Sequence, residues 1–161
     1  DMINLSRVTR SAMERRDVDL SGLVREVLAD ILRSDADRKV EIVIADRLSA
    51  RGDERLLRIA LQNLLSNAWK FTSKRADARI TFGVIGQRDG KTVYFVRDNG
   101  AGFNMNHAGK LFTPFERLHA SSDFPGNGIG LATVQRVIER HGGRVWAEGV
   151  VGQGATFYFT L

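Results

Sequence analysis

The chain has 161 residues, 43% of them hydrophobic, which is enough to bury one core, so we expect one main domain. It contains no cysteine, which excludes a disulfide scaffold and a thiolate metal site. The net charge is +5, but basic and acidic residues are interleaved without a dense basic stripe, so we interpret the charge as a solvated surface and expect no nucleic-acid binding.

Helical and strand patterns alternate in the first half of the chain. Residues 1–16 carry apolar side chains at helical spacing, which predicts a helix that packs on a partner. Residues 17–21 offer capping side chains for a second helix over 22–34. Apolar alternation predicts a strand over 39–45, and a long amphipathic helix is predicted over 53–71.

The next part contains two strands and one long irregular segment. The strands are predicted over 79–86 and 91–97, joined by a tight turn at Asp89. Residues 99–125 contain three glycines and both prolines without a sustained period. Since so long a segment without regular structure is usually functional or disordered, we interpret about 104–125 as a lid over a site.

A helix from Leu131 to about residue 141 and strands over 144–148 and 155–161 complete the pattern. This order predicts an α/β (α+β) two-layer sandwich, with a mixed, mainly antiparallel sheet of five or more strands and three helices on one face. No apolar run approaches the ~20 residues of a membrane span. We expect a cytoplasmic location, whether the parent protein is soluble or membrane-anchored.

The helix over 53–71 carries a polar stripe beside its apolar one. At ~100° per residue, Asn63, Asn67 and Lys70 fall within ~60° of one another. An asparagine oxygen is a suitable Mg²⁺ ligand, and a lysine one turn on can meet phosphate oxygens. The same stripe also fits a solvated polar face.

Two glycine motifs follow. Asp98 ends a strand, and Gly100 and Gly102 let the backbone turn beside it, so its carboxylate can accept the exocyclic amine of adenine. An ordinary turn aspartate is the alternative. The second motif precedes a helix and exposes backbone amides that suit an anion, or else it is a simple capping turn; its residues are Gly126, Gly128, Gly130 and Leu131.

The lid pairs apolar residues with a cation. Phe112 and Phe115 are interpreted as anchors that pin the lid to the domain, although plain packing explains them equally. Arg117 can then reach terminal phosphates, where a cation stabilises the charge of a phosphoryl group in transfer.

In this order the motifs resemble those of one family. Residues 63–71 resemble an N box, 98–102 a first glycine box, 111–115 an F box and 126–131 a second glycine box, and 152–157 resemble the closing segment. The set is similar to the catalytic, ATP-binding domain of sensor histidine kinases, within the gyrase, Hsp90 and MutL ATPase superfamily. Residues 115–119 and 146–149 are similar to those of phytochrome-like and related sensor kinases.

The resemblance implies a site for ATP and Mg²⁺ and assigns roles to the matching side chains. It gives Asn67 as the Mg²⁺ ligand with Asn63 beside it, Lys70 and Arg117 as phosphate contacts, Phe71 as a contact near the nucleotide, Asp98 as the adenine contact and Thr156 as a partner of Asp98. ATPase branches usually carry a glutamate base where this chain has Asn63, which favours phosphoryl transfer over hydrolysis.

The resemblance also implies a domain division and partners. Residues 1–16 resemble the end of the second helix of a dimerisation hairpin, and 17–161 the catalytic domain. The hairpin's phosphoacceptor histidine is expected upstream, outside this chain. The implied function is transfer of the γ-phosphoryl of Mg-ATP to that histidine and onward to a response regulator, in a parent homodimer of which this piece alone is a monomer.

Three alternatives remain open. One is another superfamily ATPase or serine kinase that acts on a regulatory partner. A second is a nucleotide-gated interaction module without turnover. The third, nucleic-acid binding through net charge, predicts a steep salt dependence and no need for Mg²⁺.

Overall fold

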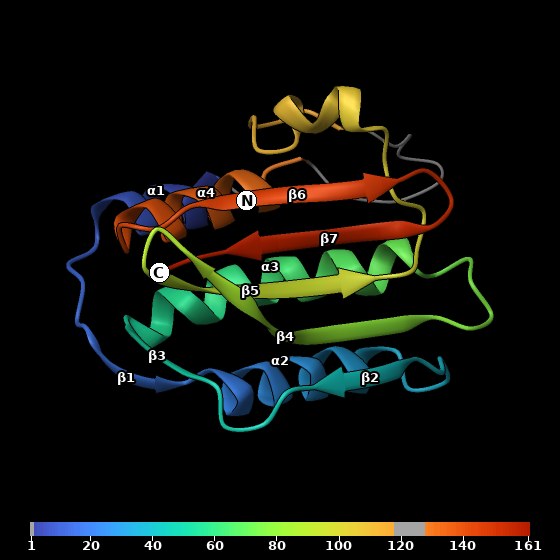
Figure 1. Ribbon diagram of the computed structural model, residues 1–161, viewed down its shortest axis with the longest axis horizontal. Helices are drawn as coiled ribbons and strands as arrows, with labels where there is room; N and C mark the ends of the chain where they lie inside the picture. Colours follow the sequence, from blue (N-terminus) through green and yellow to red (C-terminus); the bar gives the residue numbers. More distant parts are fainter. Residues whose placement is uncertain (1, 118–127) are drawn as a thin grey trace.

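The computed structural model describes residues 2–117 and 128–161. Figure 1 shows a sheet as one layer and helices as the other. The sheet has five strands in the order β2-β4-β5-β7-β6; β2 is parallel to β4 and the other neighbours are antiparallel. Their bounds are β2 Glu41–Ile44, β4 Arg79–Arg88, β5 Lys91–Asp98, β6 Val145–Val150 and β7 Gly154–Phe159.

The helices cover one face of this sheet (Figure 1). Buried leucines of helix α3, Glu54–Phe71, pack with Ile80 and Phe82 of β4 and with Phe159 of β7 in one core. No helix in the part of the chain that the structure describes is long and apolar enough to cross a membrane. Because the helices pack on one face of the sheet, the predicted two-layer sandwich is confirmed. The helices are α1 Met2–Arg10, α2 Leu20–Ser34, α3 Glu54–Phe71 and α4 Gly130–Arg140.

The N-terminal segment differs from the prediction of one helix over 1–16. Helix α1 ends at Arg10, and a short strand β1, Arg16–Asp19, pairs antiparallel with β3, Ser49–Gly52, in a separate two-stranded sheet. The backbone amide of Glu14 donates to the Asp53 carboxylate, so the chain leaves helical geometry to reach the start of α3. Four-residue strands of this kind carry too little periodicity to be predicted.

A buried cluster joins the first turn of α3 to the last turn of α4. Asp53 caps α3 by accepting from the backbone amide of Leu56 at 3.0 Å. The backbone amide of Asp53 donates to Nε2 of His141 at 3.0 Å, and Nδ1 of that ring lies 2.7 Å from the carbonyl oxygen of Val137. The ring therefore carries its proton on Nδ1, and burial lowers the pKa of His141 below its ordinary value.

This lowered pKa predicts a pH effect on stability. The unfolded chain takes up a proton at this residue near pH ~6.5, whereas the folded chain resists it, so the stabilisation is present above that pH and is lost as the pH falls. We expect the difference in free energy of unfolding between wild type and His141→Gln to shrink from pH 7.5 to pH 5.5. Urea denaturation at both pH values measures it.

The difference between the two proteins removes the contribution of other titrating groups, including the buried carboxyl of Asp98, which both proteins retain. A difference that stays constant across this pH range contradicts the prediction.

Candidate functional site

A cavity of about 280 Å³ lies between α3, the N-terminus of α4 and the adjoining ends of β5 and β7. It collects side chains and backbone from motifs that are far apart in the sequence. Most of the predicted site residues line it: Asn63, Asn67, Lys70, Phe71, Asp98, Gly102, Arg117, Gly128, Gly130 and Leu131. The polar stripe of α3 is thus part of a site wall and not an open solvated face.

A buried carboxylate forms part of the cavity wall. Asp98 is 6% exposed and its Oδ1 accepts from the amide of Gly100 at 2.9 Å. Burial raises the pKa of Asp98 to about 6, against the opposing effect of hydrogen bonds from the amides of Gly100 and Ala155. Above that pH the carboxyl is ionised and offers a hydrogen-bond acceptor in a cavity that the apolar rings of Phe103 and Phe157 also line.

Two cations, Lys70 and Arg117, also line the cavity. The pKa of Lys70 is lowered first by burial and then by the positive charge of Arg117, and its Nζ lies 4.8 Å from the ring centroid of Phe71. Within the described ranges no carboxylate forms an ion pair with Lys70. An anion between the two cations would relieve both the desolvation and the repulsion.

Two asparagines of α3 line the same cavity. Nδ2 of Asn63 donates to the carbonyl of Ile59 at 3.0 Å, which turns Oδ1 toward Gly130. A Cβ atom on Gly130 would stand 2.9 Å from that oxygen. Asn67 makes no side-chain hydrogen bond with the rest of the described chain, so its carbonyl oxygen is available to a ligand.

The first part of the lid packs on the domain through one of the two predicted anchors. The ring of Phe112 meets Phe157 edge-on, with centroids 6.4 Å apart. Phe115 is 59% exposed, so its interpretation as a side-chain anchor is wrong. Instead its backbone amide donates to the carbonyl of Gly128 at 3.0 Å and ties the lid to the second glycine motif.

Two of the predicted residues that the structure describes, Gly100 and Thr156, do not line the cavity. Gly100 lies behind it, where a Cβ atom would stand 2.2 Å from the carbonyl oxygen of Phe71. Oγ1 of Thr156 accepts from Nε of Arg97 at 3.2 Å, because the two residues pair across β7 and β5 and face away from Asp98. Gly126 lies outside the described residues.

Comparison with known proteins identifies the family. The sequence pattern of the histidine kinase-, DNA gyrase B- and HSP90-like ATPases matches residues 52–161. The chain belongs to this ATPase family. The resemblance found in the motifs is thereby confirmed.

Curated relatives of this ATPase domain are sensor proteins. Cyanobacterial phytochrome B of Nostoc sp. is 34% identical over 162 residues, which cover 99% of this chain and 21% of the relative. The methanogenesis regulatory histidine kinase FilI of Methanothrix harundinacea is 35% identical over 162 residues, covering 100% and 18%. The chain thus spans about a fifth of the length of these relatives.

Solved structures share the fold of this ATPase domain. Full-length ShkA in complex with AMPPNP superposes with a TM-score of 0.79 at 29% identity, covering 99% of this chain and 34% of ShkA. The mycobacterial sensor histidine kinase MprB gives a TM-score of 0.75 at 24% identity, covering 92% and 97%. At that identity the second likeness supports the fold alone.

Several cavity residues were not predicted from the sequence. Ala155 occupies the strand position facing Asp98 that we had given to Thr156, and the β5–β7 register is what separates the two. The others lie within or directly after the recognised motifs, so proximity was a usable signal: Ser66, Phe103, Leu111, Glu116 and Phe157. No group of three or more His, Cys, Asp or Glu within residues 2–117 and 128–161 is arranged to hold a metal ion.

Gly102 provides a test of how tightly this ATPase site is built. Its φ is +64°, and a Cβ atom would stand 2.0 Å from the carbonyl oxygen of Val150. We expect Gly102→Ala to lower the free energy of unfolding by ~1–3 kcal/mol or more. The strain of a left-handed backbone at alanine adds to the steric clash of its Cβ atom with Val150. Chemical denaturation measures the loss.

Gly109→Ala is the matched control. That glycine lies in the exposed 3₁₀ helix Met105–Lys110, and nothing stands within 4 Å of a Cβ atom there. Equal stability of the two variants would contradict the geometry assigned to Gly102.

Proposed function

We propose that this domain binds Mg-ATP and donates the γ-phosphoryl to a histidine on a separate dimerisation domain of the same protein. One observation carries the proposal: a single cavity is lined both by a buried acceptor, Asp98, and by the cations Lys70 and Arg117. Membership of the ATPase family, relatives named as histidine kinases and a structural neighbour solved with AMPPNP support it.

The carboxylate of Asp98 suits adenine. The carboxylate accepts a hydrogen bond from the exocyclic amine, and the rings of Phe103 and Phe157 provide apolar contact for the base. Guanine presents a carbonyl oxygen at the same position, which a carboxylate repels. The buried, ionised Asp98 therefore favours adenine over guanine.

The side chains of Asn67, Lys70 and Arg117 suit a triphosphate with Mg²⁺. The hard cation prefers oxygen ligands and takes most of them from phosphate and water, so the available oxygen of Asn67 suffices on the protein side. Bound there, Mg²⁺ would neutralise phosphate charge. Lys70 and Arg117 add fixed positive charge, and Arg117 arrives on the lid, where it can offset charge that develops during transfer.

The polar face favours transfer to a protein acceptor over hydrolysis. Asn63 donates to Ile59 through Nδ2, and an amide cannot take a proton from water near neutral pH. Lacking a base at this position, the domain would activate water poorly. The acceptor then has to supply its own nucleophile, as a histidine side chain does.

The remaining parts of the proposal concern the whole protein. Residues 1–16 belong to the end of a dimerisation hairpin and 17–161 to the catalytic domain. The lid extends from about residue 104 to 125, and its part from 118 onward lies outside the described residues. The parent acts in the cytoplasm as a homodimer and passes the phosphoryl group to a response regulator in a phosphorelay, whereas this chain alone is monomeric. The sensor-protein relatives, of which it spans about a fifth, support this assignment.

Calorimetric titration with AMPPNP, with and without Mg²⁺, tests the binding site. We expect Asp98→Ala to weaken binding by ~10–100-fold, because it removes a hydrogen bond to a charged group. Asn67→Ala should bind equally with and without Mg²⁺. Asp46→Ala serves as the control, because its exposed carboxylate pairs with Arg25 away from the cavity. Failure of the folded wild type to bind contradicts the proposal.

Mixing the chain with labelled ATP and the purified dimerisation hairpin of its parent tests transfer. We expect label on the hairpin as an acid-labile phosphoramidate and none on the chain alone, because the acceptor histidine lies on the hairpin. Arg117→Ala should slow transfer by ~10-fold or more while changing nucleotide affinity less, since it acts on charge in the transition state. Labelling of the chain itself would point to another acceptor.

A further inference from the structure

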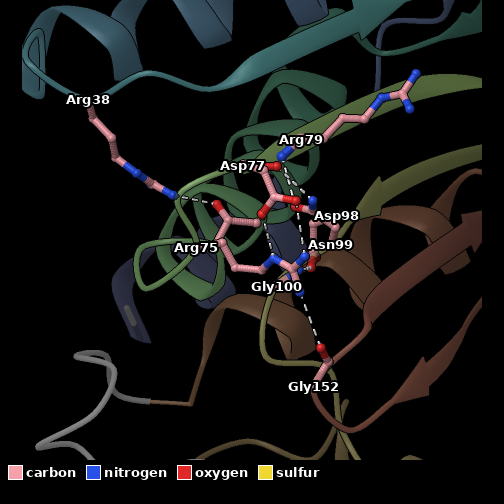
Figure 2. A network of polar contacts seen from close by, with 9 residues as sticks. Arg38, Arg75, Asp77, Arg79, Asp98, Asn99, Gly100 and Gly152 are labelled. Carbon is pink, nitrogen blue, oxygen red and sulfur yellow. Dashed lines mark hydrogen bonds and ion pairs between the residues drawn. The ribbon is translucent and has the colours of Figure 1, made fainter.

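The side chain of Asn99 supplies hydrogen bonds to the neighbouring strand where the backbone of β5 ends and leaves the sheet. The last β4–β5 pair is Ile80 with Asp98. One residue on, Oδ1 of Asn99 accepts from the amide of Arg79 at 2.8 Å, and its Nδ2 donates to the carbonyl of Asp77 at 2.8 Å. Figure 2 shows these contacts. The backbone can therefore turn away after Asp98 without leaving polar groups of the neighbouring strand unpaired.

The turn that follows is enclosed by other backbone segments. The amide of Ala101 donates to the carbonyl of Phe71 at 2.9 Å. A Cβ atom on Gly154 would stand 2.1 Å from the carbonyl oxygen of Asp98, so this strand edge has no room to shift. With Asn99 holding its outer side, the turn fixes the amide of Gly100 that orients the Asp98 carboxylate.

A second link in the same network lies at the surface and is weaker. Nε and Nη2 of Arg75 donate to the two carboxylate oxygens of Asp77 at 3.1 and 3.3 Å. Nη1 of the same residue donates to the carbonyl of Gly152 at 3.3 Å (Figure 2). Arg75 and Asp77 are 36% and 75% exposed in their side chains. Exposed ion pairs contribute little. Asn99, itself a partly buried residue, instead bonds backbone groups on both sides of the strand edge, so we take it as the main outer support of the turn.

We propose that Asn99 is a positioning residue that sets the preference of this cavity for adenine over guanine by holding Asp98 in place. The inference rests on the proposed function, because it assumes that Asp98 meets the base. Asn99 itself touches the backbone of Asp77 and Arg79 and not the cavity. Its effect reaches the ligand only through the direction and dehydration of the Asp98 carboxylate.

The test compares Mg-AMPPNP with its guanine counterpart on the full chain. In Asn99→Ala the turn loses two hydrogen bonds, so we expect adenine affinity to fall by ~10-fold with little change for guanine, and selectivity to fall by the same factor. Arg79→Ala is the matched control, because Asn99 bonds only to the backbone of that residue. It should keep wild-type selectivity.

A pH profile separates positioning from a merely structural role. In the wild type, adenosine affinity should fall as the pH drops through about 6, where the buried Asp98 takes up a proton. Adenosine is the probe because it has no phosphate that titrates there. In Asn99→Ala a looser, hydrated carboxylate should move this midpoint toward the ordinary aspartate value near ~4.

A second variant covers the case in which Asn99→Ala fails to fold. Asn99→Asp keeps the acceptor for the Arg79 amide and loses only the donor to Asp77, so it should lose less selectivity. A folded Asn99 variant with wild-type selectivity and an unmoved pH midpoint overturns this inference alone. A wild type that binds no nucleotide overturns the proposed function, and this inference with it.

Discussion

Helix α3 buries one stripe of leucines under the sheet and turns a separate polar stripe to the cavity. Leu61, Leu64 and Leu65 are each at most 1% exposed, so the rotation of the helix about its axis is fixed by burial. Asn67 and Lys70 then face the cavity as a consequence of core packing. Substitutions that disturb this core therefore change the site, even where they lie far from any ligand.

The turn after Asp98 depends on close approach of backbone to backbone. Gly100 stands against the carbonyl of Phe71, and Gly154 stands against that of Asp98. Side chains at these glycines would push α3 and β7 away from the turn and admit water to the carboxylate. The same enclosure that raises the pKa of Asp98 thus also defines the direction in which it can accept a hydrogen bond.

Charged groups of both signs face this cavity. The cavity is lined by the carboxylate of Asp98 and also by the partly desolvated ammonium of Lys70, which feels the positive charge of Arg117. The apolar rings of Phe103 and Phe157 line the same cavity. An adenine nucleotide suits this lining, because it combines a hydrogen-bond donor on a flat apolar ring with negative charge.

Local periodicity made the long elements predictable. The helix expected over 53–71 is observed over Glu54–Phe71, because an amphipathic stripe is a property of one segment and its own burial. Strand β5 and the turn after Asp98 were predicted for the same reason, since a strand pattern followed by glycines is contained in a few consecutive residues.

The sequence by itself determined the order of the motifs, the polar stripe of α3 and the residue types that suit Mg-ATP. The tertiary structure alone decided that Ala155 and not Thr156 faces Asp98, because strand register sets which side chains share a face. It also decided that β1 pairs with β3 and that Asn99 completes the sheet edge. Each of these depends on the meeting of segments distant in sequence, which no local pattern encodes.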